Sequence, residues 1–278
     1  MKTRTFIFSI RSSKMSKGFL WFAQNNDKTD YVDLSIKLAK TIKRWNKNNK
    51  ICVVTDAESK FENDNVDVVK VLRQDHSADH DIKWANECQA FELTPFKHTI
   101  KIEADMVWTL NTDWWWYHLW QHDLVFSVNC RDYRDNIVEK TPYRDIFVRN
   151  QLPNIYSALI YFRKSKKAQK FFNLAKTIVE NWNEVKTKML VSCHDKYPST
   201  DVVFALAYRI MDPTFSGLID YEWFKFIHHK PAVHNLQRMK NHNDYLYPNK
   251  VGDALYLGER RVSRIWHYHE KELNARIF

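Results

Sequence analysis

Glycine is scarce in this chain, with only four residues among 278, at positions 18, 217, 252 and 258. Such wide separation excludes the Gly-x-Gly-x-x-Gly and P-loop motifs, in which closely spaced glycines let backbone N–H groups hold phosphates. A protein of this composition that binds a diphosphate needs another source of positive charge, and a metal ion is the obvious one. The shortage of glycine therefore directs attention to metal-ligating side chains.

Cysteine is also sparse and unclustered. The four cysteines, at positions 52, 88, 130 and 193, form no Cys-x-x-Cys pair, which excludes thioredoxin-like motifs and cysteine-rich zinc sites. Nothing in their spacing indicates a disulfide framework, as is typical of a reducing compartment. No apolar run is long enough for a membrane span, and the run from Phe6 to Ile10 is too short for a signal peptide. We therefore expect a cytoplasmic protein without a membrane span.

The chain is rich in hydrophobic and aromatic residues, at 44% and 15%, which is enough to bury a sizeable core and argues against disorder. There are 43 Lys and Arg against 33 Asp and Glu, giving a net charge of +10. The basic residues cluster within residues 37–50, 163–170 and 225–240. Such clusters suit a polyanionic partner or simply a solvated surface, and charge alone leaves both readings open.

Hydrophobic periodicity predicts alternating strands and helices along the first half of the chain. The predicted strands cover residues 4–10, 19–23, 51–56, 66–72 and 99–102, and the predicted helices cover 31–45 and 84–93. This alternation predicts an α/β fold with a mostly parallel central sheet flanked by helices. Ligands of such sheets bind beyond the carboxyl ends of the strands, where Asp56 and the triplet Glu103-Ala104-Asp105 fall.

Further elements are predicted downstream. Helices are expected at residues 113–120, 168–182 and 201–211, and strands at 124–128 and 156–162. Ser199 and Thr200 are placed to cap the last of these helices. The pattern weakens beyond residue 212, so we expect a less regular C-terminal portion. No linker divides the chain, and its length suits a single domain over residues 1–278.

The acidic triplet is the strongest chemical signal in the sequence. Glu103 and Asp105 follow a buried strand, and alternate residues of a strand project to the same side. Two carboxylates at such a position offer hard oxygen ligands for Mg²⁺ or Mn²⁺. A cation held there can bridge a diphosphate and neutralise the charge of a departing nucleoside diphosphate. On spacing alone the triplet could equally be a solvated acidic turn, but its place after a buried strand favours the metal site.

The segment that contains the triplet resembles a known family. Residues 91–106, FELTPFKHTIKIEADM, are similar to the L-x-P-F-x-x-x-L-Y-L-D-A-D stretch of glycosyltransferases with the GT-A fold, most closely the glycogenin and bacterial galactosyltransferase group. The chain departs from that family at three positions. Glu103 stands where the family has Asp, Ser157 where the family has Asn, and Val202 where the family has Gln. Other segments resemble the family in the same order along the chain, at residues 19–24, 51–56, 157–162, 200–206 and 265–268.

The resemblance implies a Rossmann-like GT-A fold, a UDP-sugar donor, a Mn²⁺ or Mg²⁺ cofactor and retention of anomeric configuration. It divides the single domain into a nucleotide-sugar half, residues 1–125, and an acceptor half with a C-terminal extension, residues 126–278. It makes Asp105 the direct metal ligand and lets Glu103 contact the cation or the ribose. His267, or else His269, completes the metal site. A single histidine in a strand more often has a structural role than a metal-binding one. Two histidines in the same strand make it more probable that one of them binds the metal.

The resemblance also assigns residues to the donor and the acceptor. Tyr31 packs on the base or simply in the core, and Lys83 reaches the diphosphate or lies on the surface. Asp201 contacts the acceptor or donor sugar, or supplies charge to the first turn of its helix. Together with Tyr31, three residues would line the uridine pocket: Ala23, Gln24 and Asp56.

The basic clusters and the aromatic surplus suggest the acceptor. Lys and Arg bind phosphates, and aromatic rings can stack on an exposed base. We therefore hypothesise that the acceptor is DNA bearing a hydroxymethylated pyrimidine, as in viral DNA-glucosylating enzymes, which would act in the host cytoplasm. Two alternatives stay open. One is a glycan- or protein-directed transferase of the same fold, and the other is a non-catalytic nucleic-acid-binding protein whose acidic triplet is a surface turn.

Overall fold

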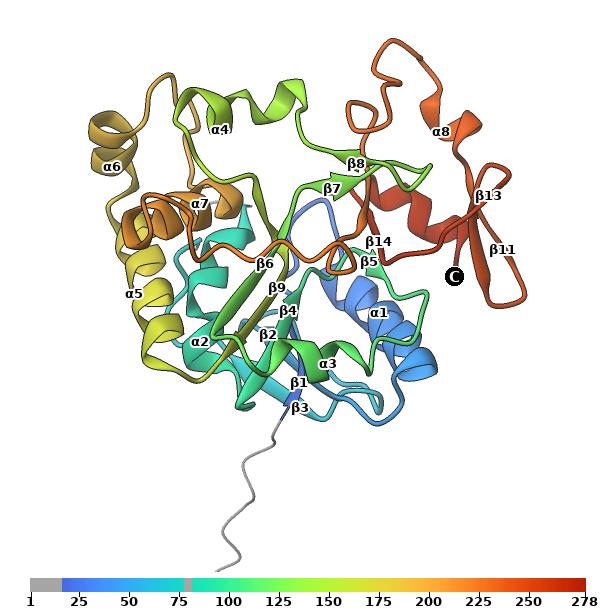
Figure 1. The fold of residues 1–278 in the computed structure, drawn as a ribbon. Coiled ribbons are helices and arrows are strands. Elements are labelled where there is room, and N and C mark those ends of the chain that lie inside the picture. Colours follow the sequence, from blue (N-terminus) through green and yellow to red (C-terminus); the bar gives the residue numbers. More distant parts are fainter. Residues whose placement is uncertain (1–16, 78–81) are drawn as a thin grey trace, which may run out of the picture.

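The computed structural model describes residues 17–77 and 82–278. The strand predicted at residues 4–10 lies outside the described residues. The remaining chain is a mixed α/β structure with a mainly parallel central sheet between helices (Figure 1). The predicted fold class is therefore confirmed at this level.

The central sheet has six strands in the order β3-β2-β1-β4-β9-β6. The first four of these strands run parallel to one another, and β9 is antiparallel to both β4 and β6. Because β9 comes from beyond residue 125 yet lies between β4 and β6, the two predicted halves share one sheet. The strands are β1 (Lys17–Phe22), β2 (Lys50–Thr55), β3 (Val68–Val71), β4 (His98–Ile102), β6 (Leu124–Val128) and β9 (Ile155–Arg163).

Helices cover both faces of this sheet, and the alternation along β1 shows why two cores form (Figure 1). Phe19 and Trp21 pack with α1 (Tyr31–Trp45) and α3 (Trp115–Leu119) on one face. Leu20 between them packs on the other face, since successive strand side chains point to opposite sides. The helices of that second face are α2 (Ala90–Leu93), α5 (Lys166–Glu180) and α7 (Thr200–Met211).

Helix α1 forms where its hydrophobic spacing predicts it. The Asp30 side chain caps the helix by accepting a hydrogen bond from the backbone N–H of Asp33. Leu34, Leu38 and Ile42 recur at helical spacing and are buried against the sheet. This helix begins just after the carboxyl end of β1, so its first turn lies at the edge of the sheet where ligands of such folds bind.

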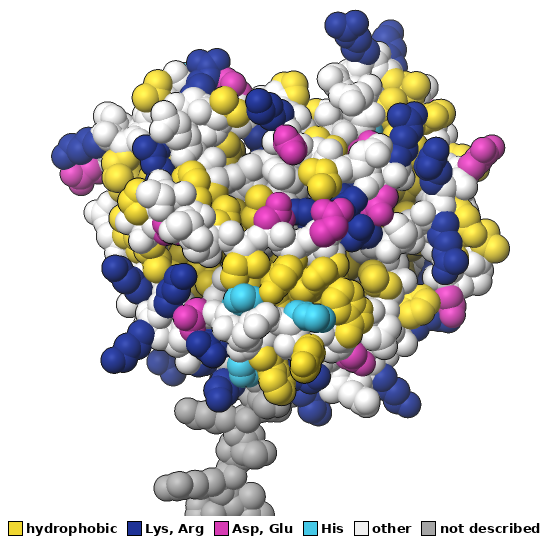
Figure 2. Space-filling model, viewed as in Figure 1, with side chains coloured by type: hydrophobic (Ala, Val, Ile, Leu, Met, Phe, Trp, Pro, Cys, Tyr) yellow, Lys and Arg dark blue, Asp and Glu magenta, His cyan; other side chains and the backbone are white. Residues whose placement is uncertain are grey.

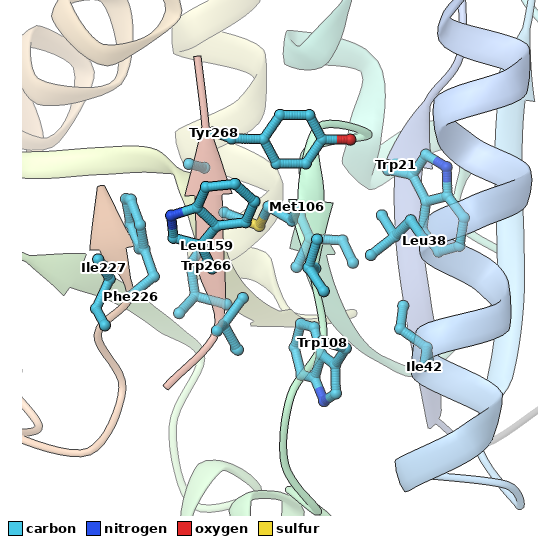
Figure 3. Close-up of a cluster of buried hydrophobic side chains, with 14 of the residues drawn as sticks. Trp21, Leu38, Ile42, Met106, Trp108, Leu159, Phe226, Ile227, Trp266 and Tyr268 are labelled. Carbon is cyan, nitrogen blue, oxygen red and sulfur yellow. The ribbon is translucent and has the colours of Figure 1, made fainter. Parts of the chain in front are cut away.

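Residues beyond the central sheet build a second sheet from distant parts of the chain, in the order β5-β14-β10-β7-β8. Strand β14 pairs with β5 on one side, His267 opposite Met106, and with β10 on the other, His267 opposite His228. Trp266 and Tyr268 of β14 are fully buried in the core that β5 shares with α1 (Figure 3). The strands are β5 (Met106–Val107), β7 (Cys130–Arg131), β8 (Ile137–Val138), β10 (Ile227–His229) and β14 (Trp266–Tyr268).

The C-terminal portion is more regular than the sequence predicts. Besides β10 and β14, it contains a small antiparallel sheet in the order β11-β12-β13 and the short helices α8 and η3. These strands have only two to four residues, too few for periodicity to reveal them. The bounds are α8 (His242–Tyr245), β11 (Pro248–Val251), β12 (Ala254–Leu257), β13 (Arg260–Arg261) and η3 (Lys271–Arg276).

Two predicted helices differ from the observed ones. The segment predicted as a helix at 84–93 is a 3-10 helix, η1 (Lys83–Gln89), followed by α2. Its buried Asn86 and Gln89 bond to the loop at residues 74–76, which ties the segment to that loop. The predicted helix at 168–182 ends at Glu180, because Asn181 caps it, and α6 (Trp182–Met189) then begins separately.

The predicted cap of α7 is wrong in its chemistry. Ser199 occupies the N-cap position, but its side chain makes no capping hydrogen bond. The Thr200 hydroxyl donates instead to the carbonyl of Trp84, which joins α7 to η1.

Helix α3 is shorter than the predicted 113–120 segment, and η2 (Pro142–Arg144) and α4 (Asp145–Arg149) follow β8. Across the described part of the chain, no helix is both long enough and apolar enough to cross a membrane.

The one glycine of the central sheet, Gly18, gives a test of how tightly β1 is packed against β2 and against Phe96, just before β4. A Cβ on Gly18 would lie 2.5 Å from ring atoms of Phe96 and 2.7 Å from the carbonyl oxygen of Lys50. We expect Gly18→Ala to lower the free energy of unfolding by about 1–3 kcal/mol, as overpacked cores do. Urea unfolding followed by circular dichroism measures this change. Gly217→Ala is the matched control, because its nearest neighbour is the Asp212 side-chain end at 3.3 Å. Equal effects of the two substitutions would contradict the packing argument.

Candidate metal centre and cavity

The acidic triplet lies in a turn and not in a strand. Strand β4 ends at Ile102, and Glu103, Ala104 and Asp105 connect it to β5. The prediction that strand alternation aligns the two carboxylates is therefore wrong in its reason. The turn nevertheless brings both carboxylates to the same side, at the carboxyl end of a central strand of the sheet.

A third ligand comes from the far end of the chain. Nε2 of His267 lies 3.1 Å from Oε2 of Glu103 and 3.3 Å from Oδ1 of Asp105. One possible ligand atom from each of these three residues lies within 4.8 Å of the others, and in the described residues this is the group that could hold a metal ion. Two carboxylate oxygens and one imidazole nitrogen suit Mn²⁺ or Mg²⁺. His269 lines the same cavity but is not in the group, so the geometry selects His267 of the two histidines.

Positive charge balances the two carboxylates. Lys271 Nζ contacts Asp105, and burial, which alone would raise the pKa of Asp105, is more than offset by Lys271 and His267. The pKa of Asp105 therefore lies well below its usual range. Burial lowers the pKa of His267, but the two carboxylates outweigh it and raise that pKa to about 9. A divalent cation would replace these positive charges and release the His267 proton, since a metal ligand must be deprotonated.

His228 orients the His267 ring from behind. The Nδ1 atoms of the two rings lie 3.0 Å apart, and both residues are buried. Burial, together with the charge of His267, holds the pKa of His228 far below its usual value, so His228 is neutral. Its Nδ1 accepts the hydrogen bond that His267 Nδ1–H donates, which leaves His267 Nε2 facing the carboxylates. Such a contact behind a metal-ligating histidine fixes its tautomer and ring orientation.

Lys101 holds Glu103 from inside the sheet. Its side chain is fully buried, and Nζ lies 2.5 Å from Glu87 Oε2 and 3.7 Å from Glu103 Oε1. It also donates a 2.9 Å hydrogen bond to the carbonyl of Ser157 on β9. A buried ammonium with two carboxylates and a carbonyl is well compensated. Burial is the main cause that raises the pKa of Glu87, and the charge of Lys101 partly offsets that rise.

Asp201 is fixed at the start of α7. Its carboxylate accepts from Arg144 at 2.6 Å and from the backbone N–H of Ser157 at 2.7 Å. Burial raises the pKa of Asp201. The charge of Arg144 and the hydrogen bonds of Ser157 lower that pKa by more than burial raises it, so it lies below its usual value. The carboxylate therefore stays ionised and held in one position. Asp201 also lies in the first turn of α7, so the alternative interpretation, a charge supplied to that turn, is compatible with the structure.

These groups surround one cavity of about 300 Å³. Its volume is at the lower end of the range for small-molecule sites. Of the residues singled out in the sequence, two do not line it, Ala23 and Asp56. The eight that do are Gln24, Tyr31, Lys83, Glu103, Asp105, Asp201, His267 and His269.

Ala23 and Asp56 support the cavity wall from outside. Ala23 is fully buried and donates its N–H to the carbonyl of Val54. Asp56 accepts a 3.1 Å hydrogen bond from Gln24 Nε2, and Asn86 donates at 2.8 Å to Gln24 Oε1. Gln24 is thus held at both ends of its amide, so it presents a fixed polar surface to the cavity.

Sequence reasoning misses several groups of the site. It treats His228 and Lys230 only as members of a basic cluster, and it does not single out Lys101 or Lys271. A signal exists for two of them. Lys101 interrupts a buried apolar strand, where a charged residue requires a partner. Lys271 follows His267 by four residues, close enough to share its environment.

Lys and Arg side chains do not form one continuous patch on the face that Figure 2 shows. Figure 2 shows Lys and Arg side chains around the whole outline of one face, with Asp and Glu between them. Many are paired, as Lys37 is with Asp33 at 2.8 Å and Arg163 is with Asp123 at 2.6 Å. Hydrophobic and His side chains gather over α3 in the same view. The exposed aromatic residues of α3 and of the positions on either side of it, Trp114, Tyr117 and Trp120, do not line the cavity.

Metal binding should stabilise the folded chain through His267 and not through His269. At free Mn²⁺ 100-fold above Kd, we expect about 2.7 kcal/mol of added stability, seen as a rise of several degrees in Tm. His267→Gln should abolish the rise, and His269→Gln should retain it. Differential scanning fluorimetry with and without EDTA measures both. Circular dichroism of the metal-free variants separates lost binding from lost folding, and a rise that depends on His269 would contradict the assignment.

Comparisons with known proteins leave the family of this chain open. No protein-family model matches the sequence. A search of curated proteins also found no significant match. What the chain does must therefore be argued from the residues that surround its cavity.

Proposed function

We propose that this protein is a metal-dependent glycosyltransferase of the GT-A type, which transfers a hexose from a UDP-sugar to an acceptor hydroxyl. The observation that carries the proposal is the Glu103–Asp105–His267 group, placed inside a cavity at the carboxyl end of a central parallel strand. The mainly parallel sheet is compatible with that fold class. The likeness of residues 91–106 to the family's acidic motif adds support from the sequence.

The donor diphosphate fits the charge pattern around this group. A divalent cation bound by Glu103, Asp105 and His267 would act as a Lewis acid on the diphosphate of the leaving nucleotide. Lys271 contacts Asp105 at the edge of the cavity. Once a cation neutralises Asp105, the ammonium of Lys271 is free to bind a phosphate oxygen. The chain thus provides positive charge without a glycine-rich loop.

The nucleoside would lie between the ends of β1 and α1. Gln24, Tyr31 and Lys83 line that part of the cavity with Phe22 and Asn26. Gln24 is oriented by Asp56 and Asn86, so its amide presents fixed hydrogen-bonding atoms, which suit recognition of a base or ribose. Lys83, which lines the cavity, donates to the carbonyl of Ser77 at 3.2 Å, and this bond restricts its ammonium.

Asp201 is suited to bind a sugar hydroxyl. Its carboxylate is ionised and immobilised by Arg144 and Ser157, and it lines the cavity together with the metal ligands. A fixed carboxylate that accepts hydrogen bonds can hold the transferred hexose or the acceptor in a reactive orientation. Retention of configuration, implied by the family resemblance, is part of the proposal.

Asp105→Asn should lower kcat by roughly 10²–10³-fold, because the cation that stabilises the leaving diphosphate loses a charged ligand. The measurement is release of UDP from UDP-glucose or UDP-galactose in the presence of Mn²⁺. Asp64→Asn is the matched control, since Asp64 is exposed and does not line the cavity. Isothermal titration with UDP and Mn²⁺ tests the non-catalytic alternative, because binding of both is expected of a transferase and of neither in a protein that only binds nucleic acid. A chain that binds neither, but binds DNA with a strong salt dependence, would refute the transferase proposal.

For the acceptor, we propose DNA bearing a hydroxymethylated pyrimidine. An enzyme that modifies a base must reach it outside the base stack, and the cavity that contains the candidate metal group would have to receive the extruded nucleotide. Incubation with labelled UDP-glucose and hydroxymethylcytosine DNA should label the DNA, and unmodified DNA of the same sequence should stay unlabelled. Transfer to a glycan or a protein, with none to any modified DNA, would sink the DNA acceptor while leaving the transferase proposal intact.

A further inference from the structure

Lys230 is a cation that lines the cavity. It follows β10 directly and lines the cavity beside Tyr143 and Asp201. Its Nζ lies 4.7 Å from the centroid of the Tyr143 ring, a cation–π contact. Within residues 17–77 and 82–278, no carboxylate forms an ion pair with this ammonium.

The neighbouring charged groups are already satisfied, which sets Lys230 apart. Lys271 contacts Asp105, and Lys101 pairs with Glu87. Asp201, the carboxylate with the strongest electrostatic effect on Lys230, is bound by Arg144 at 2.6 Å. Burial is the main cause that lowers the pKa of Lys230. A partly buried ammonium without a counter-ion is costly, so an anion supplied by a ligand would stabilise it.

Lys230 and Lys271 contact different aromatic residues of the cavity. Lys271 Nζ lies 5.7 Å from the Tyr31 ring centroid, at the start of α1, where the nucleoside would bind. Lys230 lies against Tyr143 of η2, whose hydroxyl is 3.3 Å from that of Tyr156 on β9. The two lysines therefore have different aromatic neighbours, and the electrostatic effect of Asp201 on Lys230 puts that carboxylate near Lys230.

We propose that Lys230, held by the face of the Tyr143 ring, binds an anionic phosphate group of the acceptor. This assignment rests on the proposed function, in which the cation and Lys271 bind the donor diphosphate and leave Lys230 free. The ammonium supplies the point charge that recognises phosphate, and the aromatic ring keeps it directed into the cavity. The same chemistry would recognise the phosphomonoester of a small acceptor or the phosphodiester of a nucleic acid.

The test uses the whole protein loaded with saturating UDP and Mg²⁺, so that the donor half is filled. Isothermal titration with inorganic phosphate should then detect a site that Lys230→Met weakens at least tenfold and that Lys230→Arg retains. Lys271→Met should show the reverse pattern, with weaker UDP binding and unchanged phosphate binding. Lys240→Met is the matched control, because Lys240 belongs to the same basic cluster but is exposed outside the cavity.

A second titration, with an unphosphorylated thymidine tetranucleotide, distinguishes the two sources of phosphate. Tighter binding of the tetranucleotide that depends on Lys230 assigns a phosphodiester acceptor, and tighter binding of inorganic phosphate assigns a monoester. If folded Lys230→Met binds phosphate as tightly as the wild type does, the acceptor assignment is overturned. It is also overturned if this variant loses affinity for UDP instead of phosphate. In both cases the proposed function itself is unaffected. If the wild-type protein binds no UDP with Mg²⁺ or Mn²⁺, the proposed function fails and the acceptor assignment fails with it.

Discussion

Two carboxylates held close together in a partly buried turn dominate the physics of this molecule. Glu103 and Asp105 repel each other, and burial makes the repulsion stronger, so the fold has to supply positive charge around them. Lys101 does so from within the sheet, His267 from the facing strand and Lys271 from the segment after it. The cavity forms around these balanced charges. A divalent cation can take the place of the positive side chains, because it would bring positive charge to the same carboxylate oxygen atoms.

The balance depends on strand pairing between distant segments. Strand β14 lies between β5 and β10, which puts His267 opposite Met106 on one side and opposite His228 on the other. The buried rings of Trp266 and Tyr268 hold β14 in the core, which fixes the backbone position from which His267 projects (Figure 3). A rigid arrangement of this kind keeps ligand atoms in place before a cation arrives, as an efficient metal site requires.

Sequence patterns were sufficient where the structure is local and long. The helix at residues 31–45 and the strand before Glu103 both follow from hydrophobic spacing, and the acidic residues at its end could be found by their chemistry. Patterns were insufficient where direction or pairing decides. Hydrophobicity does not say that β9 runs antiparallel between β4 and β6, and strands of two or three residues carry too little periodicity to be recognised.

What the sequence determined by itself is an α/β chain that lacks phosphate-binding glycines and carries Glu103 and Asp105 after a buried strand. The tertiary structure alone decided between His267 and His269, since both have the same side chain and only the register of β14 against β5 brings one to the carboxylates. It also decided the roles of Lys101, His228 and Lys230. The effect of a charge depends on what surrounds it, and neighbours that are distant in sequence become neighbours only when the chain folds.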